Sequence, residues 1–260
     1  MYADDTVLFC SHKDINIVQQ CLEDDFRLLS QWLKDNELIV NFKKGKTEVM
    51  VFGTHPRLKK LQNDPIRIEH CGNMINSITS YKYLGIQLTP SLNMTSHITD
   101  SIKKASTRIR LLRKTRSFMD TETANLVYQT LILPLFTYCS LSIYGATPEY
   151  LKRQIVKIEN RVERIVGRPI QTCEQVLVKR ICSFVHRCIY NNNVCDVFDN
   201  YFKFKTTSVN TRNNGKKLVI PRFKLEAFRA SFKFQGVKLF NSLPVEARIE
   251  NDFSAFKKYL

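Results

Sequence analysis

The chain begins with Met1-Tyr2-Ala3-Asp4-Asp5-Thr6-Val7-Leu8-Phe9-Cys10, in which two adjacent carboxylates stand before an apolar run. Carboxylate oxygens are ligands that Mg²⁺ accepts, so a paired aspartate beside a strand predicts a divalent-cation site. The apolar run, residues 6–10, predicts a buried strand. Outward from it, the spacing of apolar side chains from Ile15 to Leu33 predicts a core-facing helix whose buried stripe is widened by Cys21, Leu28 and Trp32. Two short β-rich runs follow at Leu38–Phe42 and Thr47–Phe52.

Later segments predict hairpins and then helices. Between Pro65 and Leu88, alternating apolar residues and a Gly72-Asn73 pair predict antiparallel sheet. From about Leu92 the apolar spacing becomes helical, and Asn191–Lys217 has the composition of a loop. The predicted fold class is therefore α+β, an antiparallel sheet with a helix followed by a mostly α-helical part. The later helices are predicted at Ile98–Lys114, Asp120–Leu131, Glu149–Ile165, Glu174–Tyr190 and Phe223–Leu239. Asp120 and Thr147 are the expected N-caps of the second and third of these, and Pro134 is expected to kink or end the second.

Charge is distributed unevenly along the chain. The 40 Lys and Arg against 24 Asp and Glu give a net charge of +16. Residues 1–92 hold 11 basic and 11 acidic side chains, whereas residues 93–260 hold 29 and 13, which accounts for the whole excess. A strongly basic part predicts a polyanionic partner, either nucleic acid or an anionic membrane surface. Two basic helix faces are expected to be exposed, with Lys103, Arg110 and Lys114 on one and Arg153, Lys157, Arg161 and Arg164 on the other.

The sequence predicts an intracellular protein, in the nucleus or the cytoplasm. Its acidic start lacks the positive charge and the following apolar stretch of a secretory signal. The most apolar segment, Leu131–Tyr144, contains Pro134 and is shorter than the roughly 20 residues that span a bilayer, so no membrane anchor is expected. The eight cysteines are scattered and predict buried reduced thiols. A zinc site is disfavoured because the spacing of its candidate ligands fits a buried helix face better, the candidates being Cys182, His186, Cys188 and Cys195.

Four motifs occur in order along the chain. Tyr2-Ala3-Asp4-Asp5 is followed by Trp32–Phe52, by Tyr81-Lys82-Tyr83-Leu84-Gly85-Ile86, and by a C-terminal segment that contains Arg212 and Phe240-Asn241-Ser242-Leu243-Pro244. They resemble the YxDD box, the W-x-x-x-N-x-L-x-x-N…KT-x-x-M-x-F stretch, the KYLG motif and the TR…WN-x-LP…FK segment of LINE-type (non-LTR), jockey-like retrotransposon reverse transcriptases. Phe240 stands where that pattern usually has Trp. The resemblance covers nearly the whole chain.

The resemblance implies transfer of a nucleotide from a dNTP to a primer 3′-OH, with Mg²⁺ as the cofactor. It implies that Asp4 is the main metal ligand, that Asp5 is its weaker partner, and that Tyr2 shapes the nucleotide pocket. A surface turn of two aspartates without a metal is the alternative. Lys46 lies in a lysine-rich turn, where it either steers the triphosphate or is simply solvated.

The resemblance also implies a binding site for a template-primer of RNA and DNA. Tyr83, Leu84 and Gly85 correspond to the primer grip, where glycine allows close approach of a backbone; an ordinary hairpin strand is the alternative. The two basic helix faces correspond to a thumb that lies along phosphates, because Lys and Arg there would release counterions on binding. The oligomeric state is left open.

Three parts are expected: residues 1–90 as the end of the palm, 91–170 as a helical thumb and 171–260 as a helical C-terminal extension. Reverse transcriptases need fingers and a third carboxylate that come before the YxDD box, and here Met1 stands directly before it. We therefore expect template-primer binding without polymerase activity from this chain by itself. Two alternatives stay open, a non-catalytic nucleic-acid-binding protein derived from a retroelement and a decayed reading frame without function.

Overall fold

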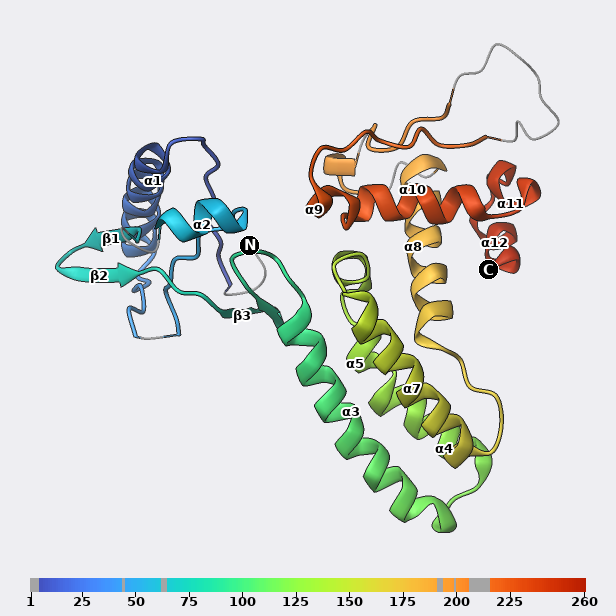
Figure 1. Cartoon of the computed structure of the whole chain (residues 1–260). Helices are drawn as coiled ribbons and strands as arrows, with labels where there is room; N and C mark the ends of the chain where they lie inside the picture. The colour runs from blue at the N-terminus through green and yellow to red at the C-terminus, as the bar shows by residue number, and fades with distance from the viewer. Residues whose placement is uncertain (1–4, 44, 62–64, 191–193, 199, 206–215) are drawn as a thin grey trace. The chain divides into compact units, whose positions relative to one another are not determined.

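The computed structural model describes residues 5–43, 45–61, 65–190, 194–198, 200–205 and 216–260 (Figure 1). The chain divides into two compact units, residues 1–93 and 94–260. The first combines one long helix with short antiparallel hairpins, and the second is mostly helical, in agreement with the predicted α+β class. The finer division into three parts stays a prediction.

The predicted first helix is present as α1, Ile15–Asp35. It begins at Asp14, whose carboxylate accepts a hydrogen bond of 2.9 Å from a backbone N–H in the first turn, a favourable N-cap. Its buried stripe is narrower than the sequence predicts. Phe26 is buried in the core, but Leu28 and Trp32 are 71% and 53% exposed. The expectation that both widen the core-facing side is therefore wrong.

Three strands predicted in this unit are absent. Residues 6–10 form no ladder, and the side chain of Phe9 is 86% exposed, so the expected buried strand there is wrong. Leu38–Phe42 and Thr47–Phe52 are also irregular, apart from a single parallel bridge between Val49 and Ser77. Apolar β-rich runs become strands only when a neighbour completes their backbone hydrogen bonds, and among the described residues these runs make only isolated contacts, such as the hydrogen bond of 2.8 Å from the N–H of Ile78 to the carbonyl of Val49.

Two antiparallel hairpins confirm the sheet predicted between Pro65 and Leu88. Each turns through two residues with positive φ, Cys71-Gly72 (49° and 74°) and Leu84-Gly85 (44° and 83°). Such paired left-handed residues match the twist of the flanking strands, which is why two-residue hairpin loops adopt them. The elements are β1 (Arg67–His70), β2 (Asn73–Asn76), β3 (Tyr81–Tyr83) and β4 (Ile86–Leu88), preceded by a short helix, α2 (His55–Leu61), that the sequence did not predict.

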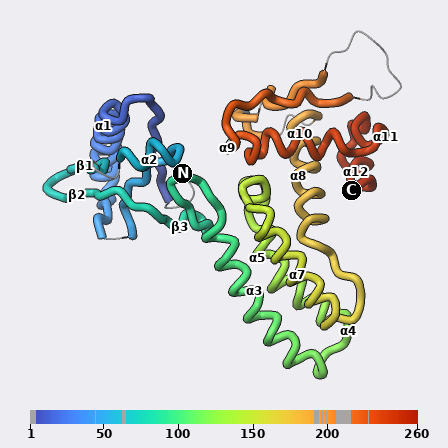
Figure 2. Tube along the Cα trace, viewed as in Figure 1, coloured from blue at the N-terminus to red at the C-terminus, as the bar shows by residue number. Residues whose placement is uncertain are grey.

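The second unit is built around long helices that follow the predicted apolar spacing. Helix α3 packs side by side with α7, and α8 packs against α10 (Figures 1 and 2). Its helices are α3 (Thr95–Thr115), α4 (Thr121–Val127), α5 (Pro134–Thr137), α6 (Ser140–Ile143), α7 (Glu149–Val166), α8 (Cys173–Tyr190), α9 (Glu226–Arg229), α10 (Phe232–Ser242), α11 (Val245–Ile249) and α12 (Phe253–Phe256). Short 3₁₀ turns lie at Arg116–Phe118, Asp196–Phe198 and Lys257–Tyr259.

The helix predicted from Asp120 is interrupted just before Pro134. Asp120 caps α4, accepting a hydrogen bond of 2.7 Å from the backbone N–H of Thr123, as the sequence predicts. Proline has no N–H to donate and its ring clashes with the preceding turn. The chain accordingly widens into a π-helix at Tyr128–Ile132 before α5 begins at Pro134. The predicted break is confirmed.

Two details of the later helices differ from the prediction. Thr147 does not cap α7; its buried hydroxyl donates a hydrogen bond of 2.8 Å to the carbonyl of Ile143, and α7 starts after Pro148. The single helix predicted at Phe223–Leu239 is divided into α9 and α10. Ser231 separates the two helices because its side chain caps the start of α10.

Arg116 joins three parts of the second unit. Its Nε donates a hydrogen bond of 2.9 Å to the carbonyl of Ile165, and Nη2 donates one of 3.2 Å to that of Val166, so the guanidinium caps the C-terminus of α7. The remaining bonds reach the carbonyl of Met119 at 2.7 Å and the hydroxyl of Thr121 at 3.0 Å. One side chain therefore holds the end of α3, the start of α4 and the end of α7 together.

Candidate nucleic-acid interface and predicted metal residues

The predicted metal pair lies at the edge of what the structure describes. Asp5 is described, and its side chain is exposed. Asp4 and Tyr2 lie outside the described residues. Within the described part of the chain, no three His, Cys, Asp or Glu side chains gather to hold a metal ion. The donor chemistry of Asp5 suits Mg²⁺, since carboxylate oxygens are its preferred protein ligands.

Lys46 lies in a tight turn. Its backbone N–H donates a hydrogen bond of 3.0 Å to the carbonyl of Lys43, and Gly45 takes the positive φ of 83° that the turn requires. The backbone N–H of Gly45 donates to Glu48 Oε1 at 2.7 Å. The side chain of Lys46 is exposed. This placement is compatible with both readings of Lys46, a phosphate-steering group and a solvated lysine.

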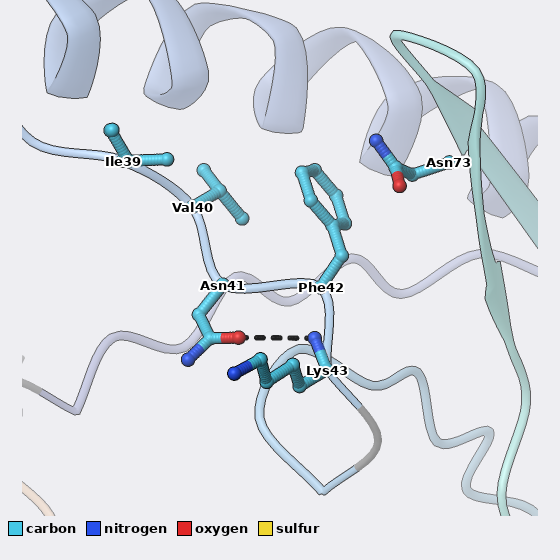
Figure 3. A pocket seen from close by; sticks show the side chains of 6 residues that line it. All are labelled: Ile39, Val40, Asn41, Phe42, Lys43 and Asn73. Atoms are coloured by element: carbon cyan, nitrogen blue, oxygen red, sulfur yellow. Dashed lines mark hydrogen bonds between the residues drawn. The ribbon is translucent and has the colours of Figure 1, made fainter.

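An open hollow of about 620 Å³ lies beside this turn, and no sequence motif predicted it (Figure 3). Phe42 forms part of its wall and contacts Phe26 edge-on at 6.3 Å and the ring of His70 at 6.3 Å between centroids. Asn41 accepts a hydrogen bond of 3.0 Å from the backbone N–H of Lys43, the dashed line in Figure 3. The lining side chains are Ile39, Val40, Asn41, Phe42, Lys43 and Asn73.

The residues predicted as a primer grip form the tip of a hairpin. Tyr83 ends β3, and Leu84 and Gly85 are the two turn residues before β4. Tyr83 and Leu84 are half-buried, whereas Gly85 is exposed. The structure thus brings the three residues together in one turn, where Gly85 leaves the backbone open to a close neighbour.

The predicted basic faces lie on α3 and α7, and all seven of their cationic side chains are exposed. In each helix the opposite face is buried, by Ala105, Ile109 and Leu112 in α3 and by Leu151 and Val162 in α7 among others. A helix rises about 1.5 Å per residue, so the four cations of α7 extend over about 16 Å of one face. We call them the α7 basic face: Arg153, Lys157, Arg161 and Arg164.

Most of these cations have no carboxylate partner among the described residues. Lys103 on α3 is paired with Asp100 at 3.4 Å, an exposed contact that solvent weakens. On α7, Arg164 donates to the backbone carbonyl of Asn160 at 3.2 Å, and the other three cations of that face take part in none of the ion pairs that the structure describes. The exposed charge is therefore available to an external anion.

Burial of Glu159 and His186 in the second unit was not predicted from the sequence, where His186 was considered only as a disfavoured zinc ligand. Glu159 is 5% exposed and accepts a hydrogen bond from the backbone N–H of Cys173; its burial raises the pKa of the carboxyl. His186 is fully buried, stacks on Phe256 at 4.2 Å and has Nε2 at 2.9 Å from the carbonyl of Glu250. A carbonyl only accepts, so Nε2 carries the proton, and burial lowers the pKa of the imidazole. Both groups serve packing, since neither reaches solvent.

The cysteines are less buried than the sequence predicts. Cys173 and Cys182 are buried, and desolvation raises the pKa of each thiol to about 12. By contrast, Cys71, Cys139 and Cys195 are exposed. The expectation of buried thiols is thus wrong for these three cysteines. They lie in turns and connections, where no buried helix face covers the thiol.

The chain is similar to the Drosophila melanogaster protein described as "Probable RNA-directed DNA polymerase from transposon BS", with 26% identity over 168 residues. The match covers 64% of this chain and 18% of the relative, so the chain spans less than a fifth of the relative's length. No protein-family model matches the chain, and no solved structure gives a significant match. The similarity confirms the predicted resemblance to a transposon reverse transcriptase, while the LINE-type subclass stays a prediction. None of the described helices is long and apolar enough to cross a membrane.

Proposed function

We propose that this chain is part of a LINE-type retrotransposon reverse transcriptase, containing the end of its palm and its basic thumb, and that it binds a template-primer of RNA and DNA. The observation that carries the proposal is the α7 basic face, four exposed cations on one side of a helix whose other side is buried. The similarity to a transposon polymerase supports the same assignment. The face of α3, with Lys103, Arg110 and Lys114, would extend the contact.

Phosphate binding follows from the arrangement of these cations. They are spaced three or four residues apart, so they lie in a row instead of around the helix. Arg and Lys that neutralise phosphates release condensed counterions, which makes the affinity depend on salt. Arg also donates two parallel hydrogen bonds to a phosphate, which favours the three arginines of this face as anchoring groups.

In the proposed polymerase, Asp4 and Asp5 would hold Mg²⁺, with Tyr2 and Lys46 beside the nucleotide. When bound, Mg²⁺ supplies charge neutralisation at the transferring phosphoryl group. Tyr83, Leu84 and Gly85 would meet the primer backbone at the hairpin tip. We further propose that the 260-residue chain by itself binds template-primer without extending it, because metal-assisted transfer depends on carboxylates held in fixed positions and Asp5 is exposed.

The binding proposal is tested by fluorescence anisotropy with an RNA–DNA primer-template over a range of salt concentrations. Replacing all four residues of the α7 basic face by Ala should make the slope of log K against log salt shallower by about 3 to 4, since each lost contact removes about 0.9. A matched variant with the same charge loss serves as control, using exposed cations elsewhere in the second unit: Lys179, Arg187, Lys238 and Lys258. Equal effects of the two variants would rule out the α7 face as the site.

The non-catalytic alternative is distinguished by primer extension with Mg²⁺ or Mn²⁺. We expect no incorporation from this chain and unchanged binding in the double variant Asp4→Ala, Asp5→Ala. Incorporation that Asp4→Ala abolishes would contradict the proposed inactivity and establish the chain as a polymerase. The absence of any binding at moderate salt would contradict both the thumb and the non-catalytic reading.

A further inference from the structure

A short antiparallel ribbon pairs a segment of the predicted loop, residues 191–217, with residues at and just after the end of that loop. Residues 203–205 run beside 217–219, with Phe204 bridged to Leu218 (Figure 2). The backbone N–H of Lys205 donates to the carbonyl of Lys217 at 2.8 Å, and that of Val219 donates to the carbonyl of Lys203 at 2.8 Å. We call residues 203–205 and 217–219 the lysine ribbon.

Asn241 of α10 holds this ribbon in place. Its Oδ1 accepts a hydrogen bond of 2.8 Å from the backbone N–H of Leu218, and its Nδ2 donates one of 3.0 Å to the carbonyl of the same residue. The side chain of Leu218 is 2% exposed, and Phe204 packs beside it against the core around Phe240. The inner side of the lysine ribbon is therefore fixed by both backbone and side-chain contacts.

The outer side of the ribbon is cationic. Successive side chains on a strand point to opposite faces, so the residues on either side of the inward-facing pair of half-buried Phe204 and buried Leu218 point outward. Lys205 lies directly opposite Lys217, and Lys203 lies opposite Val219; all three lysines are exposed. Among the residues that the structure describes, no carboxylate forms an ion pair with any of these lysines.

Like charges directly opposite on a ribbon destabilise it, because their Cβ atoms are only about 5 Å apart. The neighbouring Lys216 carries the same charge and cannot offset this repulsion. Its Nζ lies over the rings of Tyr190 at 5.0 Å and Phe204 at 5.7 Å and donates to Asn251 at 3.4 Å, so it is engaged with the core side. An anion between Lys205 and Lys217 would turn the repulsion into a favourable contact.

We propose that the lysine ribbon binds the phosphate backbone of a nucleic acid strand, as an anchoring surface additional to the α7 basic face. Alternate residues on a strand are about 6.7 Å apart, so Lys203 and the Lys205–Lys217 pair would contact two successive anions of a linear polymer. The similarity to a transposon polymerase favours nucleic acid as that polymer. Exposed Arg222 and Lys224 continue the positive charge along the chain.

The direct test acetylates the lysines of the chain without substitutions, in the presence and in the absence of a single-stranded oligonucleotide. Mass spectrometry then measures how far each lysine has reacted. Lys203, Lys205 and Lys217 should become at least several-fold less reactive when the oligonucleotide is present. Exposed lysines remote in sequence from the ribbon and α7 serve as internal controls and should change little: Lys34, Lys179 and Lys258. Unchanged reactivity of the ribbon lysines would refute the proposal, even if the α7 basic face proves to bind.

A variant supplies the second test. Replacing the three ribbon lysines by Ala leaves the inner contacts intact and should make the salt slope for a single-stranded oligonucleotide shallower by about 2, at about 0.7 for each contact. Replacing the three control lysines should leave the slope almost unchanged. Equal losses in both variants would show that only net charge matters and would overturn the proposal. Protection of the ribbon lysines by vesicles of anionic phospholipid, but not by the oligonucleotide, would also contradict it.

Discussion

Removing the Arg116 side chain should destabilise the second unit more than removing any exposed cation of α3. Arg116→Ala deletes four hydrogen bonds, two of which satisfy the last carbonyls of α7, from Ile165 and Val166. Hydrogen bonds from charged donors contribute about 1.5 to 3 kcal/mol each when buried. The side chain is half-buried, so water replaces part of this in the variant. We expect a loss of about 3 kcal/mol in the free energy of unfolding.

Urea unfolding followed by helical circular dichroism measures this loss. With a denaturant slope of about 2 kcal/mol/M, the midpoint should fall by about 1.5 M. Arg116→Lys should recover less than half of the loss, because an ammonium cannot reach both sides of the junction in the fixed geometry of a guanidinium. Arg110→Ala, at an exposed position of α3, is the control and should change stability by less than about 0.5 kcal/mol. If Arg116→Ala matched this control, the proposed role of Arg116 as the junction between α3, α4 and α7 would be refuted.

Three further predictions concern buried contacts. Asn241→Ala should cost about 2 to 3 kcal/mol and speed hydrogen exchange at the Leu218 amide, because that buried N–H loses its partner; unchanged exchange would contradict the anchoring role. Burial lowers the pKa of His186, so the folded protein resists protonation: stability should be full above about pH 6.5 and decline below it. The decline should be smaller in His186→Phe, and an unchanged urea midpoint from pH 7.5 to 5 would count against it. Iodoacetamide should alkylate exposed Cys195 long before buried Cys182, whose thiol pKa is raised to about 12; mass spectrometry showing equal rates would argue against the packing described.

Local sequence patterns predicted the helices well for a definable reason. The apolar spacing that marks α3, α7 and α8 reflects contacts within one helix face, and the cap at Asp120 reflects contacts within one turn. The effect of Pro134 is equally local, because proline lacks the N–H wherever it stands. Such features need no knowledge of distant residues.

Strands were predicted less well because their stability is not local. The runs at 6–10, 38–42 and 47–52 have strand-like composition, but each would need a partner strand to satisfy its backbone. Conversely, most of the lysine ribbon fell within the predicted loop 191–217, because its two strands are distant in sequence and Asn241 of α10 fixes their position. Among the candidate site residues, exposure of the α7 basic face could be predicted from helix periodicity, whereas the opposition of Lys205 and Lys217 could not.

The sequence by itself indicated the resemblance to a transposon reverse transcriptase, through an acidic pair followed by ordered motifs, and showed a charge excess confined to residues 93–260. These are properties of composition and order, which exist before folding. Only the tertiary structure decided which apolar side chains are buried and which distant residues meet. It leaves Leu28 and Trp32 exposed, and it brings Arg116 to the end of α7. The physical reason is that burial and long-range hydrogen bonds depend on how elements pack, and packing is decided by the whole chain at once.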